Sequence, residues 1–217
     1  MSEQPVIQVD IVSDVVCPWC IVGFKKLEKA LHETGTMAAL VWHPFELNPD
    51  MPPEGENLRE HIMRKYGSTP EQSVLARQRL QQIGEEVGFA FHFSDDSRIV
   101  NTFLAHQLLD WAYDQDGQHA LALTLFHLYF GEGLDVSDPN ILLKAVEIAG
   151  LDPEAAREVL VSQSHAGQVR AKQKVWIERG ITGVPAMIIG RKYLLVGAQE
   201  PSTYVTAIRR VLEEEAA

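Results

Sequence analysis

The sequence predicts an α/β protein in which a β-α-β unit and a β-β-α unit are separated by a long helical block. Strand-like runs of β-branched residues occur mainly near the two ends of the 217-residue chain. The middle of the chain instead repeats its apolar residues at the 3.6-residue spacing of helices. A hydrophobic content of 46% is ordinary for a globular protein, so we expect a packed core.

The first β-α-β unit follows from residues 6–45. Residues 6–13 are short and β-branched, which predicts a buried strand. After a turn, Pro18 occupies the first turn of a predicted helix, where its missing N–H is tolerated, and Gly35 is a plausible end. Residues 38–45 form the second predicted strand.

From about residue 58 to 179, nearly every segment has helical periodicity. One helix is predicted over residues 141–149, ending at Gly150, and the next begins at an Asp152 N-cap followed by Pro153. Strands return after Gly180, and residues 185–196 read as a hairpin followed by an amphipathic C-terminal helix.

The four predicted strands need one another to form a sheet, so the helical block is interpreted as an insertion. The predicted domains are therefore residues 1–57 with 180–217, and residues 58–179.

The formal net charge of −11 disfavours nucleic-acid and anionic-membrane partners, which a negative protein would repel. No apolar run approaches the roughly 18–20 residues that a membrane span needs. The N-terminal residues lack the basic and apolar regions of a secretory signal, so we expect a cytoplasmic location.

The two cysteines, Cys17 and Cys20, are separated by Pro18 and Trp19. A disulfide closing so short a loop stabilises little, which favours catalytic or metal-binding cysteines over structural ones. A zinc site needs about four ligands, and the histidines are scattered, so we expect no metal. The remaining alternative is that both cysteines are buried and have no reactive role.

Disulfide exchange needs a thiolate, whereas a free cysteine with a pKa of about 8.5 is mostly protonated at neutral pH. The strand–turn–helix context places Cys17 at a helix N-terminus, where unpaired N–H groups and the helix dipole favour the anion. Cys20 follows one turn later. We therefore expect Cys17 to be the nucleophile and Cys20 the resolving thiol.

Four motifs in this order resemble the DsbA branch of the thioredoxin superfamily, and more narrowly its FrnE-like subgroup. The resemblance spans roughly Ile7 to Arg210 and rests on residues 13–20 (SDVVCPWC), 44–52 (PFELNPDMP), 101–106 (NTFLAH) and 180–185 (GITGVP).

This resemblance implies a thioredoxin fold interrupted by an all-helical insertion that covers the active-site face. It also implies that Val184-Pro185, whose peptide isomer the sequence alone leaves open, is a cis-proline loop packed against the Cys17 sulfur. The Val184 backbone would pair with a bound peptide. Pro18 and Trp19 would lie beside the sulfur, with Trp19 on the docking surface. The family reaction needs no metal or organic cofactor.

Three further residues are weaker site candidates. Asp14 lies three residues before Cys17 and could modulate the thiolate, or it could be a turn residue that bonds its own backbone. Asn48 and Asn101 lie in the resembling motifs and could touch substrate, although loop and helix-cap roles are the plainer interpretation.

Three functions stay open. The first is a thiol–disulfide oxidoreductase, and in some settings an isomerase, acting on protein or peptide thiols with glutathione as a potential co-substrate. The second follows from the same architecture in 2-hydroxychromene-2-carboxylate isomerases and kappa-class glutathione transferases. Those relatives generally have serine in place of Cys17 and lack the resolving cysteine, so the two thiols here favour redox chemistry. The third is a chaperone-like binding module with a vestigial redox site.

Overall fold

The computed structural model describes residues 5–216, which divide into two compact units. The first unit comprises the chain up to residue 47 together with the chain from residue 170 onward, and the second comprises residues 48–169. Each observed boundary lies ten residues before the predicted one, at 47 against 57 and at 169 against 179. The α8 helix crosses the second boundary, which explains why periodicity alone did not reveal it.

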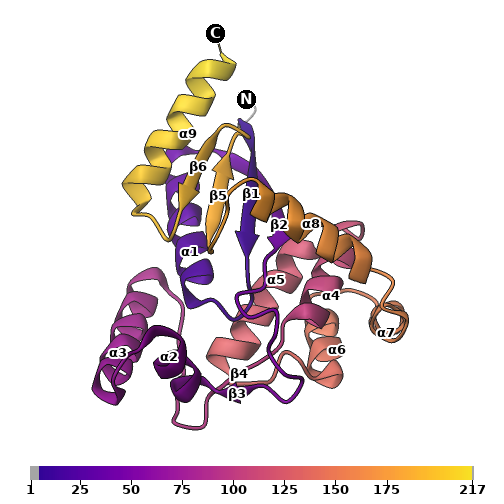
Figure 1. Ribbon diagram of the computed structural model, residues 1–217. Helices are drawn as coiled ribbons and strands as arrows, with labels where there is room; N and C mark the ends of the chain where they lie inside the picture. The colour runs from indigo at the N-terminus through magenta and orange to yellow at the C-terminus, as the bar shows by residue number, and fades with distance from the viewer. Residues whose placement is uncertain (1–4, 217) are drawn as a thin grey trace. The chain divides into compact units, whose positions relative to one another are not determined.

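A mixed four-stranded sheet with the order β2-β1-β5-β6 forms the centre of the first unit (Figure 1). Strands β1 and β2 are parallel, whereas β5 is antiparallel to both β1 and β6. Their bounds are Val6–Ser13 for β1, Met37–Pro44 for β2, Ala186–Ile189 for β5 and Tyr193–Val196 for β6. All four predicted strands are therefore present to within a residue of their predicted ends.

Helices cover both faces of this sheet. The α1 helix (Pro18–Thr34) and the α9 helix (Pro201–Glu215) pack against each other, and Gly23 of α1 approaches the side chain of Met187. The next residue toward the N-terminus, Ala186, points to the opposite face, where it joins a cluster with Trp176 of α8 (Ala166–Glu178). Since successive strand residues face opposite sides, α1 and α8 lie on opposite faces of the sheet.

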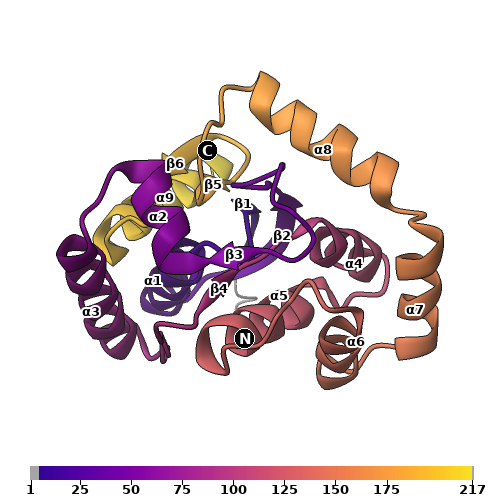
Figure 2. The same cartoon turned by 60° about the horizontal axis from the view of Figure 1, so that its bottom comes forward.

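The second unit is mainly helical (Figure 2). Four helices form a closed cycle of contacts, in which α4 touches α5, α5 touches α6, α6 touches α7 and α7 touches α4. The helices of this unit are α2 (Leu58–Tyr66), α3 (Pro70–Val87), α4 (Phe103–Tyr113), α5 (Gln118–Phe126), the π-helix η1 (His127–Gly131), α6 (Pro139–Ile148) and α7 (Pro153–Ser162).

The predicted helix boundary at residues 150–153 is present. Gly150 adopts a positive φ of 77° just after α6, and the Asp152 carboxylate accepts a hydrogen bond from the Glu154 N–H at 2.9 Å. The sequence did not predict the small antiparallel ladder between β3 (Glu56–Asn57) and β4 (Arg98–Ile99). Two-residue strands are too short to show the alternation on which strand prediction depends.

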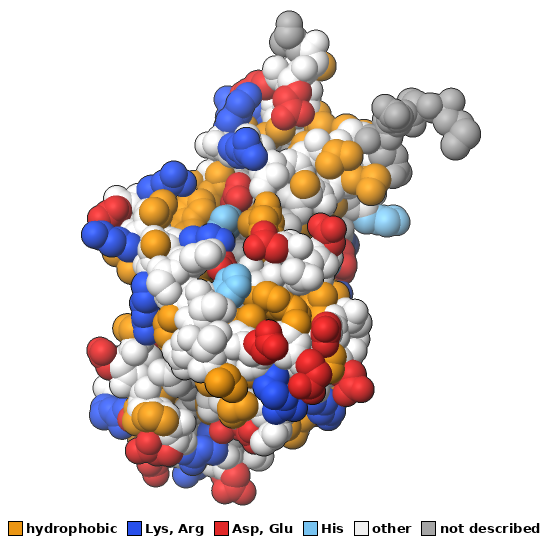
Figure 3. All heavy atoms as spheres, turned by 90° about the vertical axis from the view of Figure 1, so that its right-hand side faces the viewer, with side chains coloured by type: hydrophobic (Ala, Val, Ile, Leu, Met, Phe, Trp, Pro, Cys, Tyr) orange, Lys and Arg blue, Asp and Glu red, His pale blue; other side chains and the backbone are white. Residues whose placement is uncertain are grey.

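Charged side chains of both signs are interspersed on the face of the protein shown in Figure 3. Within residues 5–216, none of the helices combines the length and the apolar character that crossing a bilayer would require.

Candidate active site

The site begins at the end of β1, where the chain turns into α1. Cys17 is the N-cap residue of α1, with extended backbone angles of φ −95° and ψ 110°, and Pro18 is the first helical residue. The Cys17 N–H donates to the Asp14 carbonyl at 3.0 Å, and the Cys20 N–H donates to the Cys17 carbonyl at 3.1 Å. The sequence placed Cys17 at a helix N-terminus, and the structure has it there.

The two thiols lie in different environments from the neighbouring indole. Cys20 is fully buried, Cys17 is 3% exposed and Trp19 is 40% exposed. Burial raises the pKa of the Cys20 thiol well above its usual range, and the hydrogen bond and negative charge of the neighbouring Cys17 sulfur raise it further. Cys20 therefore stays protonated at neutral pH, as a thiol that acts second would.

The loop before β5 lies against the Cys17 sulfur. The Cys17 thiol donates to the Val184 carbonyl at 3.6 Å, and the peptide bond between Val184 and Pro185 is cis. A Cβ placed on Gly23 would lie 3.3 Å from the Pro185 ring and 3.3 Å from the Met187 side chain. Glycine at this position therefore allows α1 to approach the loop closely.

Asp14 holds the turn before Cys17 from two sides. Its carboxylate is buried and accepts a hydrogen bond from the Leu47 N–H at 2.7 Å, while its backbone carbonyl accepts from Cys17. The carboxylate thus links the turn to the segment after β2, which is a longer-range contact than the local turn bond considered from the sequence.

Two buried polar residues near Cys20 were not among the sequence candidates. The Ser13 hydroxyl hydrogen-bonds to Cys20 and lowers its pKa, which partly opposes the effect of burial. Burial raises the pKa of Tyr204 to about 12, and the phenol oxygen accepts from the Gln199 N–H at 3.3 Å. Ser13 lies in the quoted motif before Cys17, whereas Tyr204 looked like an ordinary apolar-face residue of α9.

A buried carboxylate also lies after β2. The Glu46 side chain is 1% exposed and pairs with Arg170 of α8, which also donates to Gln173 at 3.2 Å. The second Glu46 carboxylate oxygen has no hydrogen-bond partner among residues 5–216. A charged residue between the apolar Phe45 and Leu47 was the available sequence signal, but its partner lies 124 positions away.

Asn48 and Asn101 belong to the second unit, and their side chains have partners there. The Asn48 amide oxygen accepts from Lys65 at 2.6 Å and lies 3.1 Å from the His61 ring nitrogen Nε2. The Asn101 amide donates to the Met51 carbonyl at 2.9 Å and accepts from the Phe103 N–H at 2.9 Å. These bonds correspond to the loop and cap roles that the sequence left open.

Taken over the described part of the chain, no group of three or more His, Cys, Asp or Glu side chains converges as potential metal ligands. The polar groups around the two thiols are instead hydroxyls, backbone carbonyls and a single carboxylate engaged with Leu47.

Comparison with known proteins assigns the family. Residues 8–209 match the family described as DSBA-like thioredoxin domain. The chain belongs to this DsbA-like thioredoxin family. The predicted thioredoxin fold with a helical insertion is thereby confirmed, and the chain is an oxidoreductase of the DsbA-like kind.

Three known proteins are similar to this chain over different extents. The crystal structure of a probable DsbA oxidoreductase from Streptomyces coelicolor is 31% identical, with a TM-score of 0.89 over 96% of this chain and 91% of that one. The uncharacterized protein YwbO of Bacillus subtilis (strain 168) is 28% identical over 85% of this chain and 87% of its own. The 2-hydroxychromene-2-carboxylate isomerase of Sphingobium xenophagum is 32% identical over 36% of this chain and 40% of its own.

Proposed function

We propose that this DsbA-like protein exchanges disulfides with protein or peptide thiols through Cys17 and Cys20. One observation carries the proposal: Cys17 caps the N-terminus of α1, while Cys20 is fully buried with a pKa raised well above its usual range. The unpaired N–H groups at the start of a helix suit an attacking sulfur, whereas a fully buried thiol with a raised pKa keeps its proton. The two positions therefore support an attacking sulfur and a sulfur that acts second.

The proposed exchange needs no group beyond these thiols and the substrate disulfide. The Cys17 thiolate attacks one substrate sulfur, the substrate S–S bond breaks, and a mixed disulfide forms as the first substrate thiolate leaves. Cys20 then loses its proton and attacks the Cys17 sulfur, so that a Cys17–Cys20 disulfide forms and the second substrate thiolate leaves. The substrate gains two electrons and the protein loses two, and the reverse sequence oxidises a substrate dithiol.

The other site candidates support the two thiols in this proposal. Pro18 starts α1 directly after the attacking sulfur, and the exposed Trp19 offers an apolar surface to a substrate. The Val184 backbone, whose carbonyl already accepts from Cys17, would pair with an extended peptide. Asp14 would fix the turn. The cytoplasmic location and the substrate roles of Asn48 and Asn101 stay predictions.

Reduction of insulin and refolding of a scrambled disulfide protein test the proposal, with Cys17→Ser and Cys20→Ser variants compared with the native chain. Cys20→Ser should accumulate a mixed disulfide between Cys17 and the substrate, because the second displacement is blocked. Cys17→Ser should form none on Cys20, which the substrate cannot reach.

Two results would contradict this function. One is a native rate equal to the uncatalysed rate. The other is a Cys17 thiol that fails to react with iodoacetamide at neutral pH in the reduced protein. This test is demanding because the Cys17 side chain is only 3% exposed. Activity that survives both serine substitutions would instead support the chaperone-like module.

A second candidate is a glutathione-dependent isomerase or transferase of small molecules, favoured by the partial match to 2-hydroxychromene-2-carboxylate isomerase. It predicts tight binding of glutathione and turnover of an aromatic substrate by the double serine variant. Under the oxidoreductase proposal, glutathione is a co-substrate that resets the thiols, and the double serine variant is inactive.

A further inference from the structure

The end of α8 controls the direction in which the chain enters the loop beside Cys17. Gly180 follows the helix with a positive φ of 87°. Its N–H donates to the Ile177 carbonyl at 2.9 Å, and the Ile181 N–H donates to the Trp176 carbonyl at 3.1 Å. These two bonds around a left-handed glycine form a Schellman motif, which is commonly accompanied by an apolar contact between its last residue and the residue five positions before it.

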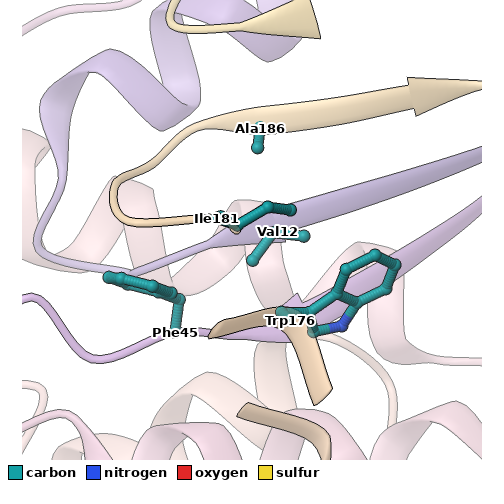
Figure 4. Packing of buried hydrophobic residues seen from close by; sticks show 5 residues of the cluster. All are labelled: Val12, Phe45, Trp176, Ile181 and Ala186. Carbon is teal, nitrogen blue, oxygen red and sulfur yellow. The ribbon is translucent and has the colours of Figure 1, made fainter. Parts of the chain in front are cut away.

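The two residues at those positions lie in one buried apolar cluster. Ile181 and Trp176 belong to one buried cluster with Val12 of β1, Phe45 after β2 and Ala186 of β5 (Figure 4). Val184, whose carbonyl accepts from the Cys17 thiol, is packed against the same cluster. The indole of Trp176 is therefore linked to the Cys17 sulfur through Ile181 and Val184.

Two further side chains lie close to the indole. The ring of His43 in β2 lies 4.7 Å from it between centroids, and the Arg179 guanidinium lies 5.0 Å from its centre. The His43 ring is held in place as well, since its Nε2 lies 2.8 Å from a carboxylate oxygen of Asp10 in β1. Trp176 thus has packing partners on the sheet and just beyond the end of its own helix, in addition to the apolar cluster.

We infer that Trp176 is a positioning residue for the exchange reaction, which holds the loop of residues 181–185 against the sulfur of Cys17. The inference rests on the proposed function, because the loop would form the backbone contact with a protein substrate. Loosening the loop should impair substrates that dock along Val184 more than small disulfides, which need to meet only the sulfur.

The test compares the native full-length protein with Trp176→Leu, Trp176→Phe and Ile181→Ala. Each variant is assayed with insulin and with the small disulfide 5,5′-dithiobis(2-nitrobenzoate). Trp176→Leu and Ile181→Ala should lower the rate with insulin by on the order of 10- to 100-fold, as expected for misplacement by about an ångström, with a much smaller change for the small disulfide. Trp176→Phe keeps an aromatic ring in the cluster and should recover most of the rate with insulin.

A matched control separates positioning from simple loss of stability. Val211 of α9 is fully buried in the same unit but lies beside Gly190, at a different part of the sheet from the cluster. Val211→Ala should lower stability without changing the ratio of the two rates. Equal losses with both substrates in Trp176→Leu and Ile181→Ala, or no recovery in Trp176→Phe, would overturn the inference.

A readout that needs no catalysis keeps this inference separate from the proposed function. Amide hydrogen exchange of residues 181–187 should become faster in Trp176→Leu and remain near the native rate in Trp176→Phe and Val211→Ala. If the native protein proves inactive, the proposed function fails, and the exchange rates alone decide whether Trp176 holds the loop. Unchanged exchange in Trp176→Leu would show that it does not.

Discussion

At the scale of single residues, Asp14 fixes the turn that presents Cys17 to a substrate. Its backbone carbonyl accepts from Cys17 and its carboxylate accepts from Leu47, so one residue joins the end of β1, the start of α1 and the segment after β2. A buried donor that loses its acceptor carries a desolvation cost. The stability of the turn should therefore depend on an acceptor being present at this position.

We expect Asp14→Ala to lower the free energy of unfolding by about 1–3 kcal/mol, because the Leu47 N–H loses the carboxylate. Asp14→Asn retains an oxygen acceptor of the same shape and should lose distinctly less. Urea denaturation of both variants at pH 7 measures the difference. Equal losses in the two variants would mean that the charge of Asp14, rather than this hydrogen bond, stabilises the turn.

At the scale of secondary-structure elements, the sequence predicted the strands and helices whose ends depend on local residue patterns. The β1 strand is rich in β-branched residues, and the start of α1 carries its own proline, so both were found to within a residue. Among the contacts of the site that join distant segments, that of Val184 with Cys17 was expected only from the family resemblance, and that of Glu46 with Arg170 was not found. Arg170 and Glu46 are far apart in the sequence, and neither residue type nor spacing reveals that they pair.

The close approach of α1 to the proline loop gives a prediction at this scale. A Cβ on Gly23 would lie 3.3 Å from Pro185 and Met187 and 3.4 Å from the backbone of Ala198. Gly23→Ala should be nearly tolerated, since small shifts of the neighbours relieve these contacts. Gly23→Val adds a Cβ and two methyl groups, and we expect it to lower the free energy of unfolding by about 1–3 kcal/mol through overpacking.

The larger side chain should also slow disulfide exchange, because it would force α1 away from Pro185. Gly167→Val in α8 is the matched control, since it makes the same change in a helix where a Cβ meets no atom within 4 Å. Thermal unfolding and insulin reduction measure both effects. A Gly23→Val variant no worse than Gly167→Val would show that the close approach has no energetic consequence.

At the scale of the whole molecule, the fully buried thiol of Cys20 makes stability depend on pH. The pKa of Cys20 is raised in the folded protein by burial and by the Cys17 sulfur, whereas in the unfolded chain it returns to about 8.5. Above that pH the unfolded chain releases a proton that the folded protein retains. The contribution of Cys20 to stability is therefore complete below about pH 8.5 and is lost as the pH rises toward the folded value.

We expect the reduced protein to lose stability between about pH 8.5 and 9.5 with a slope approaching 1.4 kcal/mol per pH unit from this residue, the limit for one proton. Cys20→Ala should remove that part of the slope, and so should oxidation of the pair, because a disulfide has no thiol proton. The raised pKa of Tyr204, about 12, adds a similar effect only above its ordinary value near 10, outside this window.

Urea denaturation of reduced, oxidised and Cys20→Ala protein at pH 7.5, 8.5 and 9.5 measures the three slopes. If reduced protein and Cys20→Ala decline in parallel, Cys20 ionises as readily in the folded chain as in the unfolded one, and its place as the buried, second-acting thiol is wrong.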